Sequence, residues 1–213
     1  IDPRAKAIGA VNTVVNKNGL LYGYNTDYSG FAHLCEAHEV DFTGRTVLIL
    51  GTGGTHNTTS AVARDKGAAK ILTVSRKPDP EKGELSYTQA LTSGAQIIIN
   101  TTPAGMYPNV GVCNLDVAAM PGLEAVLDVV YNPDKTELIL RAEEAGVPVA
   151  VGGLEMLVAQ AVYAAEYFLG RTFDDAAGEI DRITAALRRD TRNVALIGMP
   201  SCGKTTVGRA LAE

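Results

Sequence analysis

The residues best suited to chemistry include a glycine-rich loop that follows a short apolar run. The loop at 51–54 (Gly-Thr-Gly-Gly) lies between the apolar run 46–50 and a helical pattern at 55–66. Glycines let a backbone approach a pyrophosphate closely, and a helix N-terminus offers free N–H groups and partial positive charge. This order predicts a dinucleotide site, although a tight turn without a ligand would use the same glycines. His56 is equally consistent with a phosphate contact and with an exposed helix position.

The residues after the next apolar run bear on which dinucleotide is bound. The run 70–74 is followed by Ser75, Arg76 and Lys77. An NAD site usually has an acidic residue here for the ribose 2′-hydroxyl, whereas cations pair with a 2′-phosphate. The sequence therefore favours NADP, and the alternative interpretation is a solvated basic turn.

Asn12 and Asp27 are polar residues that suit a polyol. Two short strands, predicted at 8–15 and 20–24 and joined by a turn at Asn18-Gly19, bring them toward one region. Amide and carboxylate groups bind hydroxyls, and an Asp beside a cation can transfer a proton. Taken alone, both residues are equally typical of turns and helix caps.

A last motif lies at 198–205 (Gly-Met-Pro-Ser-Cys-Gly-Lys-Thr), which fits the P-loop pattern. A strand predicted at 193–198 precedes it and a helix follows. The pattern predicts ATP and Mg²⁺ binding, with Lys204 reaching the β- and γ-phosphates and Thr205 on the metal. The expected ATP-binding residues are Gly198, Gly203, Lys204, Thr205 and Thr206.

Strands alternating with helices must position these residues. Continuous apolar runs predict strands buried on both faces, which is typical of a parallel sheet covered by helices. The strands are expected at 46–50, 70–74, 96–100, 126–131 and 148–151, and the helices at 27–38, 55–66, 135–145, 154–169 and 174–189. Asp27 is expected to cap the first helix, and 188–192 is expected to be a linker. The predicted fold class is α/β, a doubly wound parallel sheet of Rossmann-like type.

Composition narrows the class of protein. The 213 residues, 46% hydrophobic with a net charge of −5, predict a soluble globular protein of one to two domains without nucleic-acid or membrane partners. Cys35, Cys113 and Cys202 lack a framework spacing and predict reduced thiols in the cytoplasm. His33, Cys35 and His38 lie close together, but zinc normally needs a further ligand pair, so a mixed helix is the favoured interpretation. No apolar run has the length of a membrane span.

From Ile8 to about Gly170 the chain resembles shikimate dehydrogenase. Six segments carry the resemblance, and their order and spacing are specific to this family although no single segment is. They are Gly9-Ala10-Val11-Asn12-Thr13, Asn25-Thr26-Asp27, Gly51–Gly54, Asn100–Met106, Asp128–Pro133 and Gly153–Gln160.

The resemblance implies roles for the matching residues. Asp27 would be half of a Lys/Asp catalytic pair that handles the hydroxyl proton while hydride moves between C3 of shikimate and the nicotinamide. The implied substrate-binding residues are Asn12, Asp27, Tyr131 and Gln160. The implied cofactor-binding residues are Gly51, Gly53, Gly54, Ser75, Arg76, Lys77, Thr102, Val129, Gly153 and Met156.

Three departures from the family pattern are expected to matter. Tyr28 replaces a glycine and would place a ring beside the active-site cleft. Thr55 and Thr58 replace alanines and would tighten the packing of helix on sheet. The acids of 78–81 (Pro-Asp-Pro-Glu) would weaken 2′-phosphate binding unless Lys82 compensates.

No segment resembles the family's first domain, which carries the catalytic Lys. The chain is therefore expected to be a fragment with a partial substrate domain, which binds NADP and turns over poorly. Residues 198–212 resemble the start of shikimate kinase, which would make the parent protein bifunctional. The expected domains are 1–43 (substrate-domain remnant and connecting helix), 44–153 (NADP-binding), 154–190 (returning helices) and 191–213 (truncated kinase segment).

Three further expectations stay open at this point. A quinate/shikimate dehydrogenase using NAD is an alternative within the family, which Arg76 and Lys77 argue against. A nucleotide-binding or interaction domain without turnover is an alternative outside it. Exposed apolar surface along Ile8–Val15 predicts self-association, for instance as a homodimer.

Overall fold

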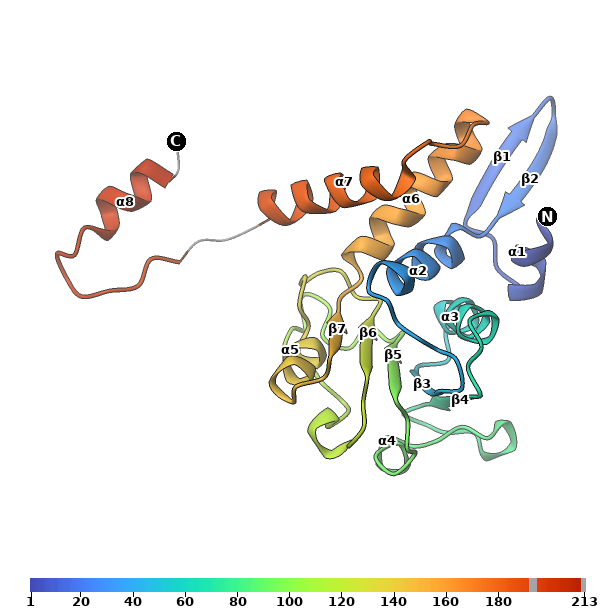
Figure 1. Ribbon diagram of the computed structural model, residues 1–213, viewed down its shortest axis with the longest axis horizontal. Helices are drawn as coiled ribbons and strands as arrows, with labels where there is room; N and C mark the ends of the chain where they lie inside the picture. The colour runs from blue at the N-terminus through green and yellow to red at the C-terminus, as the bar shows by residue number, and fades with distance from the viewer. Residues whose placement is uncertain (192–194, 212–213) are drawn as a thin grey trace.

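The computed structural model describes residues 1–191 and 195–211, and a five-stranded parallel sheet forms its centre (Figure 1). The strands are β3 (Thr46–Leu50), β4 (Lys70–Val74), β5 (Ile97–Asn100), β6 (Ala125–Asp128) and β7 (Val149–Val151). Their order is β4-β3-β5-β6-β7, so the direction of winding reverses between β3 and β5. This confirms the predicted doubly wound α/β fold, in which ligands bind where the strand order reverses.

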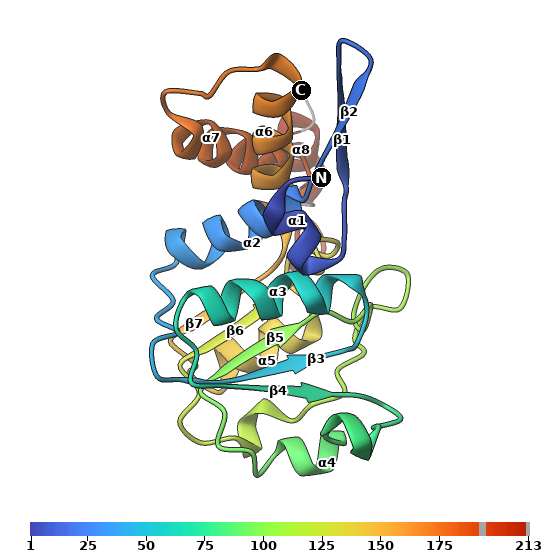
Figure 2. The same cartoon turned by 90° about the vertical axis from the view of Figure 1, so that its right-hand side faces the viewer.

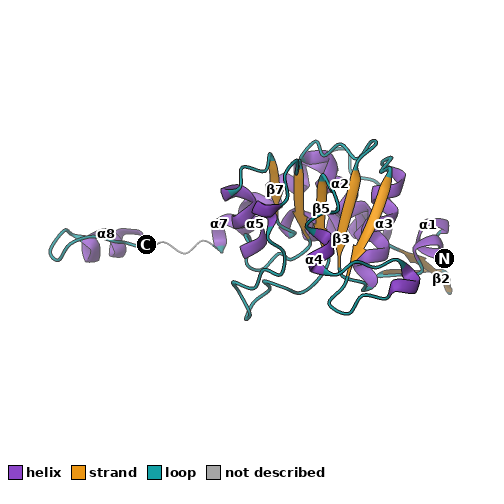
Figure 3. Ribbon diagram, turned by 90° about the horizontal axis from the view of Figure 1, so that it is seen from below, coloured by secondary structure: helices purple, strands orange, loops and turns teal. Residues whose placement is uncertain are grey.

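Helices cover both faces of this sheet, as Figures 2 and 3 show. The helices are α2 (Thr26–Ala37), α3 (Gly54–Asp65) and the start of α6 (Leu154–Leu169) on one face, and α4 (Tyr87–Ala90) and α5 (Glu137–Glu144) on the other. Successive residues of β3 face opposite sides: Ile49 packs toward α2 and α3, and Leu48 packs toward α4 and α5. Both are fully buried, so each contributes about 1.5–3 kcal/mol of hydrophobic stabilisation.

The predicted α5 and α6 are confirmed, with shifts of one or two residues at the ends of α5. The strand predicted at 126–131 is shorter, because β6 ends at Asp128. The short α4 and two 3-10 turns, η1 (Pro80–Lys82) and η2 (Val117–Ala119), were not predicted.

The N-terminal segment begins with a short helix where no helix was predicted. Helix α1 (Pro3–Ile8) starts at Pro3, and the Asp2 side chain accepts hydrogen bonds from the N–H groups of its first turn. Gly9 ends it with a φ of 77°. The strand predicted at 8–15 is therefore wrong before residue 13.

An antiparallel hairpin follows. It consists of β1 (Thr13–Lys17) and β2 (Leu20–Tyr24), joined by the predicted Asn18-Gly19 turn. The apolar surface expected along residues 8–15 is only partly exposed. Val14 is 52% exposed, whereas Ile8 and Val15 are buried. Side chains alternate inward and outward along β1, which explains the difference between Val14 and Val15, whereas Ile8 is buried at the end of α1.

Helix α2 begins one residue earlier than predicted, and Asp27 is not its cap. The Asn25 side chain accepts the hydrogen bond from the Tyr28 N–H at 3.0 Å. Asp27 therefore lies in the first turn of α2 with its carboxylate free of capping. Helix α2 packs closely on α6, because a Cβ on Gly30 would lie 2.7 Å from the Met156 carbonyl oxygen.

The C-terminal part contains α7 (Ala176–Asp190) and α8 (Lys204–Leu211). The linker predicted at 188–192 is wrong for 188–190, which belong to α7, and residue 192 lies outside the described residues. The strand predicted at 193–198 is absent over 195–198, and 193–194 lie outside the described residues. Within the described ranges, none of the helices has the length and apolar character needed to cross a bilayer.

Candidate functional site

A cavity of about 930 Å³ opens beside the carboxyl ends of β3, β4 and β5, where the strand order reverses. Its walls come from the glycine loop, the basic turn after β4 and the segment that follows β5. The lining residues are Gly51, Thr52, Gly53, Val74, Ser75, Arg76, Lys77, Tyr87, Thr101, Thr102, Pro103, Ala104, Gly105, Asn109, Val112 and Asn114. The two predicted features of a dinucleotide site, the glycine loop and the basic turn, thus meet in one cavity.

The glycine loop is closely packed at Gly51 and open at Gly53 and Gly54. Gly51 has a φ of 103°, and a Cβ there would lie 2.9 Å from both the Thr101 Oγ1 and the Thr102 Cγ2. A Cβ on Gly53 or Gly54 would have no heavy atom within 4 Å. Gly53 also caps α3 without a side-chain hydrogen bond, so the first N–H groups of the helix are available to a ligand. Open space beside free N–H groups fits a pyrophosphate.

The basic turn at the rim holds two exposed cations. Arg76 and Lys77 have no carboxylate within 4.0 Å among residues 1–191 and 195–211. The Ser75 Oγ accepts a hydrogen bond from the Lys77 N–H at 3.3 Å, which folds the turn. The expected competition from acids is reduced, because Asp79 pairs with Lys82 at 3.1 Å. Both positive charges of the turn therefore remain available to a phosphate.

A buried polar network supports the segment after β5. The Asn100 Oδ1 accepts hydrogen bonds from the Thr102 N–H at 3.1 Å and the Thr102 hydroxyl at 2.7 Å. The Asn100 amide donates to the Asp128 Oδ1 at 2.9 Å, and the Thr136 hydroxyl donates to the Asp128 Oδ2 at 2.7 Å. Burial raises the pKa of Asp128 to about 6, although these hydrogen bonds oppose the rise. The network fixes Thr102 in the cavity wall.

A second polar group gathers around Thr26 at the start of α2. The Asn12 Oδ1 accepts from the Thr26 N–H at 2.8 Å, and the Thr26 hydroxyl lies 3.4 Å from the Gln160 Oε1 of α6. Asp27 is next in the chain, and burial raises the pKa of its carboxyl while a hydrogen bond from Asn12 opposes the rise. The structure thus brings Asn12, Asp27 and Gln160 together from three segments. Tyr131 is 49% exposed and is outside the cavity lining.

Four residues implied for the cofactor do not line the cavity: Gly54, Val129, Gly153 and Met156. Gly153 instead packs against the backbone of Val129, where a Cβ would overlap the carbonyl oxygen. Met156 is buried in the core beneath α2 and α3. These two positions fix the route of the chain into α6.

Several lining residues were not foreseen. Tyr87 lies in α4, and Asn109, Val112 and Asn114 lie in the irregular segment between β5 and β6. No periodicity or motif marks the part of this segment after Met106. Thr52 and Thr101 lie inside the segments 51–54 and 100–106, and this was the one available signal for them.

Tyr28 does not lie beside the cleft, so that expectation is wrong. Its ring is buried in the core, its hydroxyl donates to the Asp65 Oδ2 at 2.6 Å, and the Arg4 guanidinium lies 4.3 Å from the ring centre. The Tyr28 hydroxyl is thus hydrogen-bonded to a residue of α3, and the face of its ring contacts a residue of α1. It therefore joins these helices to α2.

The other unusual residues of α3 also serve packing. The His56 Nε2 lies 2.8 Å from the Thr73 Oγ1 of β4, so His56 joins helix to strand. Thr58 is buried, as expected for a residue that tightens the packing of helix on sheet. Thr55 is only partly buried, and its carbonyl oxygen accepts a hydrogen bond from the Thr59 hydroxyl.

The P-loop motif forms a compact turn before α8. The Lys204 ammonium donates to the carbonyl oxygens of Gly198 at 2.8 Å and Met199 at 2.7 Å. Thr205 and Thr206 are exposed in the first turn of α8.

Comparison with known proteins gives a consistent result. No protein-family model matches the chain. It is 38% identical over 190 residues to the shikimate dehydrogenase (NADP(+)) of Clostridium perfringens strain SM101, covering 84% of this chain and 69% of that protein. The Bacillus cereus B4264 enzyme of the same name is 35% identical over 187 residues, covering 81% of this chain and 67% of that protein.

Solved structures agree. A chorismate mutase/shikimate 5-dehydrogenase fusion protein from Clostridium acetobutylicum superposes with a TM-score of 0.84 at 30% identity, covering 90% of this chain and 72% of that one. A shikimate 5-dehydrogenase from Thermus thermophilus, solved with NADP(H) and shikimate, gives a TM-score of 0.71 at 28% identity, covering 86% of this chain and 71% of that one.

Proposed function

We propose a function from the fact that this chain belongs to the shikimate dehydrogenase family. The proposal is that the chain binds NADP and takes part in the interconversion of 3-dehydroshikimate and shikimate. The observation that carries the proposal is the 930 Å³ cavity in which an open glycine loop faces a turn with two exposed cations. Its named relatives are NADP enzymes, and the Thermus thermophilus structure holds both NADP(H) and shikimate. The reaction would place the parent protein in chorismate and aromatic amino acid biosynthesis.

At the cofactor end, the residues of the chain bind and orient. The N–H groups at the start of α3 would hold the pyrophosphate beside Gly53, and Arg76 and Lys77 would pair with the 2′-phosphate. Thr102, which hydrogen bonds to Asn100 hold in place, would contact the nicotinamide end. NADP supplies the hydride acceptor when it is bound.

At the substrate end, Asn12 and Gln160 hydrogen-bond the ring hydroxyls, and Tyr131 lines the same place. Asp27 holds the hydroxyl proton, and its half-buried carboxyl with a raised pKa suits that task. The lysine that the resemblance pairs with Asp27 is in no matching motif of these 213 residues. We therefore expect this chain by itself to bind NADP and to oxidise shikimate slowly.

The decisive experiment compares NADPH with NADH by ligand fluorescence, using the whole chain and two variants. Arg76→Gln removes a cation from the cavity wall, and Arg182→Gln is the matched control because Arg182 pairs with Glu179 on α7, outside the lining. A charge-assisted hydrogen bond of about 1.5–3 kcal/mol corresponds to about 10–100-fold in affinity. We expect Arg76→Gln to weaken NADPH by this factor and to leave NADH unchanged.

The outcomes separate the alternatives. Equal affinity for NADPH and NADH, unaffected by Arg76→Gln, would favour the NAD-using quinate/shikimate dehydrogenase. Failure to bind either dinucleotide would refute the proposal. NADPH binding in a full-length parent protein without turnover would favour a non-catalytic nucleotide-binding domain.

A second function is proposed for residues 198–206, as the start of a shikimate kinase that binds ATP and Mg²⁺. The supporting observation is that the Lys204 ammonium closes the turn on the Gly198 and Met199 carbonyl oxygens, a position from which it can move onto phosphates. Thr205 would ligate Mg²⁺ and Gly203 and Thr206 would complete the phosphate contacts. Mg-ATP phosphorylation of shikimate by the full parent protein, lost on Lys204→Ala, tests this.

A further inference from the structure

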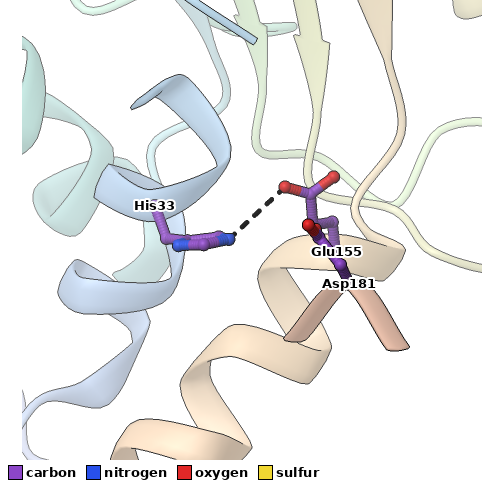
Figure 4. Close-up of side chains that lie close together, drawn as sticks. All are labelled: His33, Glu155 and Asp181. Atoms are coloured by element: carbon purple, nitrogen blue, oxygen red, sulfur yellow. Dashed lines mark ion pairs between the residues drawn. The ribbon is translucent and has the colours of Figure 1, made fainter. Parts of the chain in front are cut away.

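A cluster of metal-ligating side chains lies away from the dinucleotide cavity, where α2, α6 and α7 meet. It contains His33 on α2, Glu155 on α6 and Asp181 on α7. One ligand atom of each lies within 4.8 Å of the others. Figure 4 shows the His33 imidazole directed across from α2 to the Glu155 carboxylate.

The two buried members of the cluster have polar atoms without hydrogen-bond partners. His33 is 9% exposed and Glu155 is 6% exposed. Within the part of the chain that the structure describes, the His33 Nε2 and the Glu155 Oε1 make no hydrogen bond. Leaving such a buried atom unsatisfied costs about 1–3 kcal/mol. Both atoms belong to this cluster and lie 3.5 Å apart.

We propose that His33, Glu155 and Asp181 bind a divalent transition-metal ion of the Zn²⁺ class. Two ligands on one tetrahedral zinc, at about 2.0–2.2 Å from the metal, are separated by roughly 3.4 Å. The His33 Nε2 and Glu155 Oε1 already have this separation at 3.5 Å. Asp181 is exposed, so its carboxylate can move the remaining distance and the fourth position stays open to water.

The surroundings of Glu155 suit a metal ligand. Its other oxygen, Oε2, lies 3.0 Å from the His38 Nε2, the kind of outer hydrogen bond that orients a metal-binding carboxylate.

The simpler alternative is a structural ion pair between a protonated His33 and Glu155. That pair needs neither Asp181 nor a metal. The role of Asp181 therefore distinguishes the two interpretations, and because Asp181 is exposed its replacement leaves the fold intact.

The test measures Zn²⁺ affinity of the whole chain, freed of metal with a chelator, by competition with a chromophoric chelator. The Cys202→Ser background removes an exposed thiol that could bind zinc by itself. We expect Asp181→Asn to weaken Zn²⁺ affinity at least about 10-fold. His38→Gln should weaken it about 10–100-fold, because His38 orients the Glu155 carboxylate. Asp190→Asn, on the same helix, is the matched control and should leave the affinity unchanged.

Cobalt gives an independent reading of the ligands. Co²⁺ bound to one imidazole and two carboxylates should give a visible absorption band that Asp181→Asn shifts. No Zn²⁺ uptake at submillimolar metal, or uptake equal in Asp181→Asn and Asp190→Asn, would overturn the proposal in favour of the plain ion pair. NADPH binding does not enter this test, so the site stands or falls independently of the proposed dehydrogenase function.

Discussion

Replacing Gly51 with alanine should destabilise the protein through its backbone and its neighbours together. The φ of 103° is a conformation that costs a residue with a Cβ about 1–2 kcal/mol. The added methyl would also lie 2.9 Å from the Thr101 Oγ1, which donates to the Leu50 carbonyl oxygen at 2.7 Å. Displacing that hydroxyl forfeits a hydrogen bond of about 0.5–1.5 kcal/mol.

These contributions sum to about 1.5–3.5 kcal/mol, which lowers the melting temperature of a chain this size by roughly 3–14 °C. Urea unfolding followed by far-ultraviolet circular dichroism measures the free energy, and calorimetry measures the temperature. Gly53→Ala is the matched control, because its Cβ meets no heavy atom within 4 Å and its φ is −80°. Its cost should stay below about 1 kcal/mol, the loss of a helix-cap preference.

The effect of Gly53→Ala on NADPH affinity should be large although its effect on stability is small. A methyl on Gly53 occupies the open side of the loop, so it should weaken NADPH with little effect on stability. If Gly51→Ala unfolds within about 0.5 kcal/mol of the unaltered chain, the argument from φ and contact distance is refuted. Equal NADPH affinity for Gly53→Ala and the unaltered chain would refute the placement of the pyrophosphate.

Three further predictions test the supporting contacts. Thr136→Val should cost about 1.5–3 kcal/mol at pH 8 and less at pH 5, because Asp128, with a pKa of about 6, accepts this hydrogen bond as a carboxylate only above that pH; equal urea-unfolding costs at both pH values would contradict this. In the unaltered chain the raised pKa of Asp128 contributes stability that is present below its unfolded value and lost as the pH rises through about 6. Tyr28→Phe should cost about 1–2 kcal/mol of unfolding free energy, because it removes the hydrogen bond to Asp65, and should leave NADPH affinity unchanged. A lowered NADPH affinity would contradict the placement of Tyr28 away from the cleft. Asn25→Ala should cost about 1 kcal/mol of unfolding free energy by removing the cap of α2.

Much of the sheet could be predicted from the sequence because its strands are continuous apolar runs. Residues 46–50 and 70–74 were predicted with the bounds that the structure shows, since both faces of each strand are covered. The segment 8–15 misled for the same reason. Its apolar residues suggest a strand, but Asp2 and Pro3 start a helix and Gly9 stops it, and these local signals decide the conformation.

Some residues of the candidate site could also be predicted from the sequence, and others could not. Gly51 and Arg76 could be predicted because motif and strand end coincide, and a doubly wound sheet brings strand ends together. Asn109 and Asn114 could not, because they reach the cavity from an irregular segment whose path depends on tertiary packing. Tyr28 was misplaced because sequence shows which residue replaces a glycine, but not that Asp65 accepts its hydroxyl.

The cap of α2 has a consequence for the study of intermediates. Since Asn25 satisfies the helix N-terminus, changing the nearby Asp27 costs a first-turn charge, about 0.3–1 kcal/mol, and alters its hydrogen bond with Asn12. Two positions only two residues apart thus separate the maintenance of the helix from the proposed handling of a proton. An Asp27→Asn protein should remain folded with its cavity intact, so it offers a stalled form in which bound dinucleotide and polyol can be trapped together for crystallisation.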